Sequence, residues 1–584
     1  MIKVQNLSYS YPQKDLYRKI SFTIEDNIHC ALIGTNGTGK STLIDMLIHP
    51  DEYLYDGTID LNIAGRVGYV SQFSQSDPKA DLTVFEYISD EFAELEQKIA
   101  AYCKAMETAA DLEPIFAKYQ AALDEFDAVD GNNYVSNIKK RLKAAKLEKL
   151  PDQKLSNLSG GEFKLVQVIR AMMLSPGLLI MDEPDVFLDF GHLNALRNLI
   201  NTHKGTLLVI THNRYLLNHC FNKILHLEQT DIQEFDGTYI EYNYELLATK
   251  IDLQEAAAAD QAEIDRQSKI LDKARIRASI MDNASLGKTV HARQSLVDRL
   301  KARKTKPPFV AVRQPEIHFN SEKEVADEYI LELKDYSLAF DEQLLEHVDL
   351  QMKPADHVAI VGNNGTGKTT LLHDIFEHAK DAIRLSDDAE LNIFCQITDS
   401  LYDDGRTLYE ILRAKGMEKE ADAADYLKKF GFEEEILSQK AGELSGGEKD
   451  LFQLAVISLG NANLLLLDEP TGHLDVYAQI ALEQAISEFK GAVLMVSHDF
   501  YTVSDCVDYV LLVENGTLRK MSKRTFRQMI YADYFDKDYL LLEQKKKEVE
   551  NRIQHYLQDN EFDKAKVQME SLEEIIKNMK RTTG

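Results

Sequence analysis

The sequence predicts two tandem copies of one α/β domain, joined by a long helical segment and followed by a C-terminal helical hairpin. Two observations carry this prediction: four short motifs occur twice in the same order, and the residues between the copies contain few turn-forming residues. With 584 residues, the chain has room for about four domains. Its hydrophobic content of 44% supplies full cores, which excludes a largely disordered chain.

The four motifs are a glycine-rich loop ending in Gly-Lys-Ser or Gly-Lys-Thr, a Leu-Ser-Gly-Gly-Glu motif, an apolar run ending in Asp-Glu-Pro, and a Thr-His or Ser-His pair. The glycine loops lie 328 positions apart and the later motifs 286, as the pairs Lys40 and Lys368, Ser159 and Ser445, Glu183 and Glu469, and His212 and His498 show. A constant offset indicates two copies of one domain. The 42-residue difference indicates an insertion in the first copy.

Apolar runs at Ile28–Ile33 and His357–Val361 precede the glycine loops, and helical patterns follow them. Strand, glycine loop and helix in this order are the context of a phosphate-binding loop, and they predict a largely parallel sheet in each copy. We place the first copy at residues 1–242 and the second at residues 323–536.

The segment between the copies, residues 243–322, is predicted to be a helical hairpin with two arms of about 50 Å. Its tip is expected near Asp282–Gly287, and Pro307-Pro308 ends the returning helix. Gly287–Thr289 in this segment repeats Gly-Lys-Thr, but Asp282 stands where the first glycine should be and no strand precedes it. We therefore predict a loop there and no nucleotide site.

Two further segments have helical patterns. The insertion in the first copy, residues 88–128, is predicted to be a shorter hairpin with legs of about 25–30 Å. In residues 537–584, apolar residues at alternating steps of three and four predict a coiled-coil hairpin that turns at Asp559-Asn560.

The glycine loops and the Asp-Glu pairs have the composition of a site for nucleotide phosphates and Mg²⁺. The glycines permit φ > 0 and close approach of backbone N–H groups to phosphate oxygens. The lysines are expected to reach the β- and γ-phosphates, and the hydroxyl after each lysine to bind Mg²⁺. Asp182 and Asp468 end apolar runs and can hold Mg²⁺ through water, while Glu183 and Glu469 can polarise an attacking water.

These motifs together, with a glutamine after a short strand in each copy, resemble the ATP-binding-cassette (ABC) superfamily. Tandem cassettes joined by a long helical linker, without a membrane domain, resemble its ABC-F subfamily, and the likeness covers nearly the whole chain. The resemblance implies two tandem ABC-type ATPase domains that hydrolyse ATP with Mg²⁺.

The resemblance also implies the site residues. The catalytic residues would be Glu183, Glu469, His212 and His498, and the Mg²⁺ ligands Ser41, Gln72, Asp182, Thr369, Gln396 and Asp468. The ATP-binding residues would be Tyr11, Gly34, Asn36, Gly37, Gly39, Lys40, Ser41, Thr42, Gln72, Ser159, Gly160, Gly161, Phe340, Gly362, Asn364, Gly365, Gly367, Lys368, Thr369, Thr370, Gln396, Ser445, Gly446 and Gly447. At Tyr11 and Phe340 stacking on adenine is implied, and packing in the core is the alternative.

Two composite sites follow from the resemblance. Site 1 would join the Lys40 loop to Ser445 and Gly447 of the second copy, and site 2 would join the Lys368 loop to Ser159 and Gly161 of the first. ATP would close the two cassettes of one monomeric chain, and hydrolysis would remove the bridge.

The two copies differ after Asp-Glu-Pro. The second copy reads Thr-Gly-His-Leu-Asp, close to the family pattern, whereas the first reads Asp185, Val186 and Phe187 before Leu-Asp. Asp189 and Asp475 preserve the aspartate that ends the motif. We expect both sites to bind ATP unequally, with the Asp185 carboxylate slowing hydrolysis or altering the coupling of the cassettes.

Charge is strongly segregated along the chain. The chain has 96 Asp+Glu against 67 Lys+Arg, a net charge of −29, which excludes a general polyanion binder. Residues 266–306 instead contain 12 Lys+Arg and three Asp, a net charge of +9. This pattern predicts local, salt-sensitive contact with nucleic acid, and the alternative is a solvated hairpin that balances the acidic cassettes. The resemblance implies that this linker meets tRNA and ribosomal RNA from the vacant tRNA exit site.

The other helical segments leave alternatives open. The acidic insertion resembles the family's arm by position and suits a basic ribosomal protein, or it is a solvated structural hairpin. The C-terminal hairpin touches nucleic acid or packs on the second cassette. Apolar residues near the linker tip pack on RNA or cap the hairpin, namely Ile280, Met281, Leu286 and Val290.

No apolar run is long enough for a membrane span, no signal peptide is evident, and the five cysteines form no metal-binding pattern. We expect a cytoplasmic ribosome-bound ATPase, acting as a translation factor or in ribosome protection against antibiotics. The alternatives are a DNA-associated ABC ATPase and the ATPase subunit of a transporter.

Overall fold

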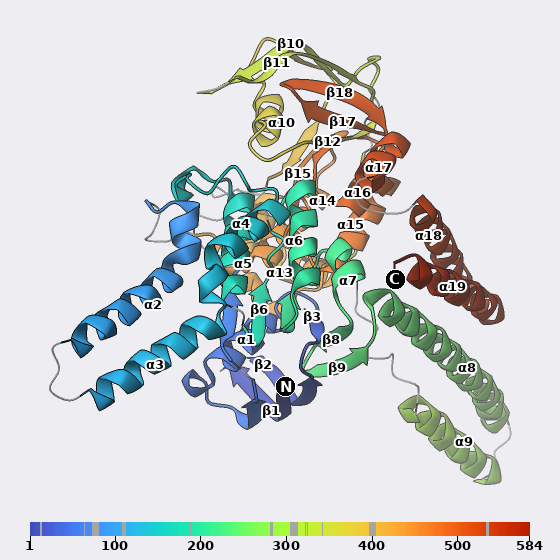
Figure 1. Cartoon of the computed structure of the whole chain (residues 1–584). Coiled ribbons are helices and arrows are strands. Elements are labelled where there is room, and N and C mark those ends of the chain that lie inside the picture. The colour runs from blue at the N-terminus through green and yellow to red at the C-terminus, as the bar shows by residue number, and fades with distance from the viewer. Residues whose placement is uncertain are drawn as a thin grey trace. The chain divides into compact units, whose positions relative to one another are not determined.

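A computed structural model describes residues 1–11, 14–63, 65–72, 81–107, 112–174, 176–186, 188–280, 284–303, 314–321, 323, 325–340, 343–395, 405–532 and 537–583. The chain divides into two compact units. The first contains Met1–Thr238 and Gln314–Met529, here named cassette 1 and cassette 2, and the second contains Tyr239–Arg313 and Ile530–Gly584 (Figure 1).

Each cassette has one six-stranded sheet and one three-stranded antiparallel sheet. The six-stranded sheets have the orders β5-β6-β7-β3-β8-β9 and β14-β15-β16-β12-β17-β18, and all their pairings are parallel except at the last strand. The small sheets have the orders β2-β1-β4 and β11-β10-β13. The two cassettes therefore have the same topology, and the predicted tandem α/β fold with largely parallel sheets is confirmed.

Cassette 1 contains β1 (Ile2–Tyr11), β2 (Lys14–Ile24), β3 (His29–Ile33), α1 (Lys40–Ile48), β4 (Asp56–Leu61), β5 (Val67–Val70), α2 (Val84–Met106), α3 (Glu113–Ala128), α4 (Tyr134–Ala144), α5 (Gly160–Met173), β6 (Leu178–Asp182), α6 (Phe190–Thr202), β7 (Thr206–Ile210), α7 (Arg214–Cys220), β8 (Lys223–Glu228) and β9 (Asp231–Asp236). Cassette 2 contains β10 (Leu331–Ala339), β11 (Gln343–Met352), β12 (His357–Val361), α10 (Lys368–Glu377), β13 (Ile383–Leu385), β14 (Leu391–Phe394), α12 (Leu408–Ala414), α13 (Glu420–Lys429), α14 (Gly446–Ser458), β15 (Leu464–Asp468), α15 (Val476–Glu488), β16 (Ala492–Val496), α16 (Phe500–Cys506), β17 (Tyr509–Glu514), β18 (Thr517–Ser522) and α17 (Lys523–Ala532).

The central strands are buried on both faces, as in parallel sheets covered by helices. Every residue of β6 and of β15 is buried, including the terminal Asp182 and Asp468. Helix α1 contributes Leu43, Ile44 and Leu47 to a core shared by the two sheets of cassette 1. This packing fixes the helix that follows the first glycine loop, and α10 is placed in the same way in cassette 2.

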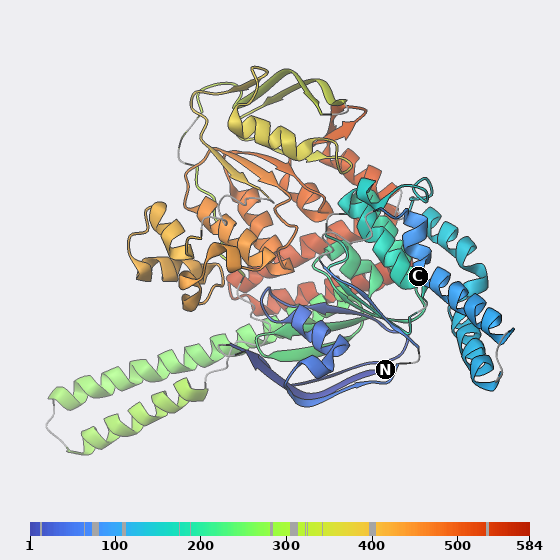
Figure 2. The same cartoon turned by 90° about the vertical axis from the view of Figure 1, so that its left-hand side faces the viewer.

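The insertion in cassette 1 forms a hairpin of α2 and α3, which run side by side in both views (Figures 1 and 2). Thr83 and Glu86 form a capping box that starts α2 four residues before the predicted insertion. Arg66 forms ion pairs with Glu91 of α2 and Glu125 of α3, which connects the two helices to the start of β5.

The second unit contains α8 (Tyr239–Ile280), α9 (Ala284–Arg303), α18 (Lys537–Gln558) and α19 (Phe562–Thr583). The prediction of a first linker arm of about 50 Å is too short, because α8 has 42 residues, or about 63 Å. The structure describes α9 over 20 residues, or about 30 Å. Helix α8 starts only three residues after β9, where no proline or second glycine delays it. Pro307-Pro308 and Met281 lie outside the described residues, and of the Ile280 and Leu286 side chains nothing is described.

Gly287–Thr289 lies within α9, so the prediction of a loop there is wrong. One interior glycine costs a helix only about 1 kcal/mol, which neighbouring helix formers offset. Among the described helices, none has an apolar stretch that could cross a membrane.

The C-terminal hairpin packs on the linker, on the first half of α8. Ile553 and Leu572 are fully buried in a cluster with Leu247 and Ile251 of α8. The turn lies at the predicted place, with Asn560 at φ 57°. Lys566 and Lys580 add ion pairs to acids of α8. From the sequence, nucleic acid and cassette 2 were both possible partners of this hairpin. Its packing on α8 was not predicted.

Replacing Ile553 by Ala should loosen the hairpin, because truncating a buried aliphatic side chain in such a cluster costs about 2–4 kcal/mol. Amide hydrogen exchange of α18 and α19 should become faster by a corresponding factor. Val567→Ala is the matched control, since Val567 is 59% exposed on the same hairpin and should change exchange little. Equal effects of the two substitutions would contradict the assigned packing.

Candidate functional site

Both glycine loops connect a central strand to a helix, β3 to α1 and β12 to α10. Gly39 and Gly367 cap these helices with φ of 94° and 85°, a region that disfavours any side chain. The first N–H groups of each helix have no partner within the helix and point to the loop. This geometry suits a phosphate group.

The loop lysines lie buried across the loops. The Nζ of Lys40 donates to the carbonyl oxygens of Gly34 and Thr35 at 3.0 and 2.9 Å, and Lys368 makes the equivalent contacts at 2.9 and 2.6 Å. Burial lowers the pKa of both lysines, and the neighbouring Asp and Glu carboxylates oppose this shift. Each loop therefore holds an ammonium group where the outer phosphates of a nucleotide would lie.

The carboxylates that end β6 and β15 lie beside the hydroxyl that follows each lysine. Thr369 Oγ1 donates to Asp468 Oδ1 at 3.1 Å. Burial raises the pKa of Asp182, and a hydrogen bond from Ser41 opposes part of this shift. The Oδ1 of Asp182 makes no hydrogen bond within the described part of the chain. A hydroxyl and a carboxylate with a free oxygen are ligands that Mg²⁺ takes, so these residues fit that ion.

The glutamates after these aspartates have strained backbones. Glu183 and Glu469 have φ of 45° and 47°, and each N–H donates to the neighbouring strand at 2.9 Å. Non-glycine residues in this region cluster at functional sites, and nothing in the sequence pattern signalled it. Gln72 Nε2 donates to Glu183 Oε2 at 2.5 Å, whereas the backbone N–H of His498 donates to Glu469 Oε2 at 3.0 Å. Gln396, the counterpart of Gln72, lies outside the described residues.

The surroundings of the glutamates and the histidines shift their pKa values. Burial raises the pKa of Glu183 to about 7, and repulsion from Asp182 adds to the shift. Burial likewise raises the pKa of Glu469 to about 7. Burial lowers the pKa of His212 far below its usual range and that of His498 to about 3, so both rings are neutral. A carboxylate whose pKa lies near 7 is matched to accept a proton from water at neutral pH.

The serine of each Leu-Ser-Gly-Gly-Glu motif is the N-cap of a helix, α5 or α14. Ser159 Oγ accepts from the N–H of Glu162 at 3.3 Å, and Ser159 N–H and Oγ both donate to the Glu162 carboxylate. Ser445 and Glu448 form the same capping box. The Ser-x-x-Glu spacing could have indicated this role of the glutamates, which sequence analysis missed.

The cassettes touch at site 1. Asn36 of the first glycine loop donates to Asp475 Oδ2 at 3.2 Å through its N–H and to the carbonyl oxygen of His473 at 2.9 Å through Nδ2. A Cβ added to Gly447 would lie 1.8 Å from Asn36 Nδ2, so only glycine fits there. The structure thus brings the Lys40 loop to the signature motif of cassette 2.

At site 2 a cavity of about 610 Å³ lies between the cassettes. Its volume is in the range of small-molecule sites. It brings together predicted residues of both copies, namely Ser159, Gly160, Gly161, His212, Phe340, Asn364, Gly365, Gly367, Lys368, Thr369, Thr370, Glu469 and His498. Phe340 is 68% exposed and Tyr11 is 48% exposed, which contradicts core packing for either aromatic ring.

Arg214 is an interface residue that sequence analysis missed. From α7 of cassette 1, its guanidinium pairs with Glu483 and with Asp499 of cassette 2 and lies over the ring of Tyr501. The repeat offset places Phe500 at the equivalent position of cassette 2, so this buried ion pair exists on one side only. The available signal was a cation two positions after the histidine in one copy, where the other copy has a phenylalanine.

Comparison with known proteins agrees with this architecture. The family model described as "ABC transporter" matches residues 17–186 and 345–472, together more than half of the chain. The uncharacterized ABC transporter ATP-binding protein YfmR of Bacillus subtilis is 28% identical over 554 residues, covering 92% of this chain and 84% of YfmR. ABC transporter F family member 5 of Arabidopsis thaliana is 26% identical, covering 88% of this chain and 75% of that protein.

A solved structure shares the fold across both cassettes. A chain from the crystal structure of the archaeal ribosome recycling factor aABCE1 with the ribosomal stalk protein aP1 has a TM-score of 0.52 and 19% identity, covering 90% of this chain and 92% of that one. The chain belongs to the ABC transporter family, as a tandem-cassette member of the ABC-F type. It is an ATPase.

The two sites should contribute unequally to turnover, because Glu183 and Glu469 have different hydrogen-bond partners and only Glu183 has the additional Asp185 carboxylate two positions after it. We expect the single variants Glu183→Gln and Glu469→Gln to lose different fractions of steady-state ATP turnover, by a factor of about 3 or more. Phosphate release at saturating ATP measures this. Equal losses would refute the asymmetry.

Proposed function

We propose that this ATPase binds the ribosome in an ATP-bound closed state, reaches tRNA and ribosomal RNA with its linker, and leaves after hydrolysis. In this proposal Glu183 and Glu469 polarise the attacking waters, with His212 and His498 beside them. Mg²⁺ is held by the hydroxyl of Ser41 or Thr369 and by Asp182 or Asp468, with Gln72 and Gln396 completing the sets. When bound, Mg²⁺ neutralises charge that develops on the phosphates.

ATP would join the cassettes because each γ-phosphate would receive N–H groups from two helices. In site 2 these are α10, which follows the glycine loop, and α5, which follows the signature serine. Hydrolysis removes the group that both helices bind, so the closed state loses its advantage.

The observation that carries the ribosome proposal is the basic surface of the linker. Lys269, Lys273 and Arg293 have no ion-pair partner among the residues that the structure describes. Their neighbours Arg266 and Arg275 form ion pairs with acids of their own helix at 3.7 and 3.4 Å, exposed contacts that contribute little, and Arg275 also donates to Gln294 of α9 at 2.6 Å. These cations are available for phosphate groups. The likeness to a ribosome recycling factor supports an RNA-rich partner.

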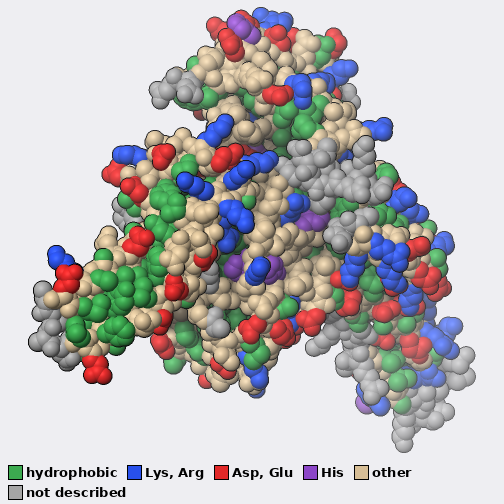
Figure 3. All heavy atoms as spheres, viewed as in Figure 1, with side chains coloured by type: hydrophobic (Ala, Val, Ile, Leu, Met, Phe, Trp, Pro, Cys, Tyr) green, Lys and Arg blue, Asp and Glu red, His purple; other side chains and the backbone are tan. Residues whose placement is uncertain are grey.

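The arm of α2 and α3 supports a protein contact of the same complex. Hydrophobic side chains gather on this hairpin (Figure 3). Leu112 and Phe116 are 53% and 56% exposed there. Apolar area with acidic neighbours suits a basic protein surface better than RNA.

The C-terminal hairpin gives DNA binding little support. Lys546 and Lys577 pair with Glu550 and Glu573 of the same helices, while Lys566 and Lys580 pair with acids of α8. Cations already paired with carboxylates have less to gain from phosphate. We therefore propose a cytoplasmic role in translation or in ribosome protection against antibiotics, which depends on what the linker tip reaches.

The Glu183→Gln/Glu469→Gln double variant should bind ATP, hydrolyse it slowly and remain closed. Run with ATP on a sucrose gradient, it should migrate with whole ribosomes, and the further changes Lys40→Ala and Lys368→Ala should abolish this. A double variant that stays at the top of the gradient would refute ribosome binding and leave the ATPase assignment intact.

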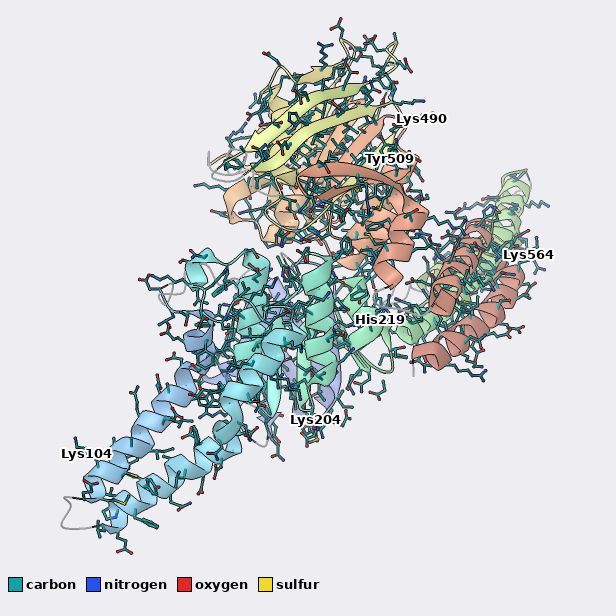
Figure 4. All side chains as sticks on the ribbon, turned by 45° about the horizontal axis from the view of Figure 1, so that its top comes forward. Lys104, Lys204, His219, Lys490, Tyr509 and Lys564 are labelled. Carbon is teal, nitrogen blue, oxygen red and sulfur yellow. The ribbon has the colours of Figure 1, made fainter. Side chains whose placement is uncertain are left out.

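Reversing the charge of the linker should weaken this co-migration. Lys269→Glu/Lys273→Glu in the trapped background should lower ribosome occupancy at least tenfold at physiological salt, since several phosphate contacts are lost. Lys204→Glu/Lys490→Glu is the matched control, because both lysines are exposed on the cassettes (Figure 4). If the two pairs reduce occupancy equally, the effect is one of net charge and the linker has no special role.

A further inference from the structure

When the two copies are aligned by the repeat offset, the charged residues at equivalent buried positions differ between the cassettes. Lys164 in α5 corresponds to Asp450 in α14, and both side chains are buried. Asp185 corresponds to Thr471, which is also buried. Cassette 1 therefore has a buried cation and an additional carboxylate where cassette 2 has a buried acid and a hydroxyl. Burying a charged group costs free energy unless other groups pair with it or form hydrogen bonds to it. The partners of these residues should therefore explain the difference between the cassettes.

Lys164 contacts the loop that carries Gln72. Its Nζ donates to the carbonyl oxygen of Ser71 at 2.5 Å and to that of Gln72 at 3.1 Å. The side chain is 5% exposed. Two carbonyl groups that converge on one buried ammonium fix the direction of the backbone between them.

The loop that carries Gln72 also contacts Glu183. Gln72 Nε2 donates to Glu183 Oε2 at 2.5 Å, so a continuous path of contacts runs from Lys164 through the Gln72 backbone to Glu183. Thr211 Oγ1 donates to Asp185 Oδ1 at 2.6 Å on the other side of the glutamate. Three carboxylates therefore lie close together at site 1, those of Asp182, Glu183 and Asp185. Lys164 and Lys40 are buried cations that interact with carboxylates of this group.

In cassette 2 the structure describes the equivalent segment as far as Cys395, which precedes Gln396. The Gln453 amide faces the backbone of Cys395, and with its oxygen and nitrogen exchanged it forms two hydrogen bonds of 3.1 Å there. Asp450 accepts a backbone N–H of His473, and a carboxyl group stands here where cassette 1 has the ammonium group of Lys164. The ammonium contact is therefore specific to cassette 1.

We propose that Lys164 is a positioning residue for site 1, which orients the Gln72 loop and thereby the Glu183 carboxylate while offsetting the charge of Asp185. This inference rests on the proposed role of Glu183. The N-cap of helix α5, Ser159, lines site 2, and five residues after it Lys164 of the same helix contacts the Gln72 loop of site 1. A shift of this one helix on binding ATP at site 2 would move the Gln72 loop of site 1.

The test separates the two sites by removing one base at a time. Glu469→Gln leaves cleavage at site 1, and Glu183→Gln leaves cleavage at site 2. The ADP formed in the first round of hydrolysis is measured by rapid quench over a series of ATP concentrations. This measurement reports cleavage even when the cassettes reopen slowly. Lys164→Met in the Glu469→Gln background should slow cleavage at least tenfold and change half-saturating ATP less than threefold.

Two comparisons exclude a merely structural effect. Lys164→Met in the Glu183→Gln background should keep the rate of site 2 within about threefold, whereas damage to α5 would lower both. Asp450→Asn in the Glu183→Gln background is the matched control and should leave that rate unchanged. An equal loss in both backgrounds, or no loss at site 1, would overturn the proposal. If Glu183→Gln does not itself remove cleavage at one site, the assigned base is wrong, which is a separate failure.

Discussion

The site depends on backbone N–H groups at the starts of helices, which cannot be satisfied within the helix. Helices α10 and α5 begin at one cavity although they belong to different cassettes. The capping boxes at Ser159 and Ser445 satisfy the N–H of the third residue in their helices, and Gly39 and Gly367, at φ > 0, begin theirs without a side-chain cap. An anion placed there is bound from two sides, so a single γ-phosphate can hold two domains together.

The two sites share this scaffold and differ in the groups that surround it. Glu183 receives a side-chain amide and Glu469 a backbone N–H, although both have the same strained backbone. Arg214 adds an ion pair on one side of the interface, and Lys164 and Asp185 add charge near Glu183 at positions where cassette 2 has Asp450 and Thr471. Tandem copies in one chain can diverge in this way because each position is encoded separately, which identical subunits do not allow.

The repeat and its offset were sufficient to predict the tandem fold, the strand before each glycine loop and the acids that end β6 and β15. These features follow from local pattern, because a buried parallel strand is an apolar run and its end is polar. The strain at Glu183 and the contact of Gly447 with Asn36 were beyond the sequence, since both depend on residues far apart in the chain. The length of α8 and the helix at Gly287 were missed because single turn-forming residues do not fix helix ends.

Helix α8 also shows how one element can serve two partners of opposite charge. Its first half contains Glu241, Asp252 and Glu255, which pair with lysines of the C-terminal hairpin around the Leu247 and Ile251 core. Beyond these contacts the charge reverses, and the basic segment begins at Arg266. Apolar packing braces the acidic half, whereas an isolated helix of the distal length would be marginal in water. The packing of the first half of α8 stabilises the whole helix, so its second half can remain helical although it contains cations without carboxylate partners in the described part of the chain. A polyanionic partner would bind those cations.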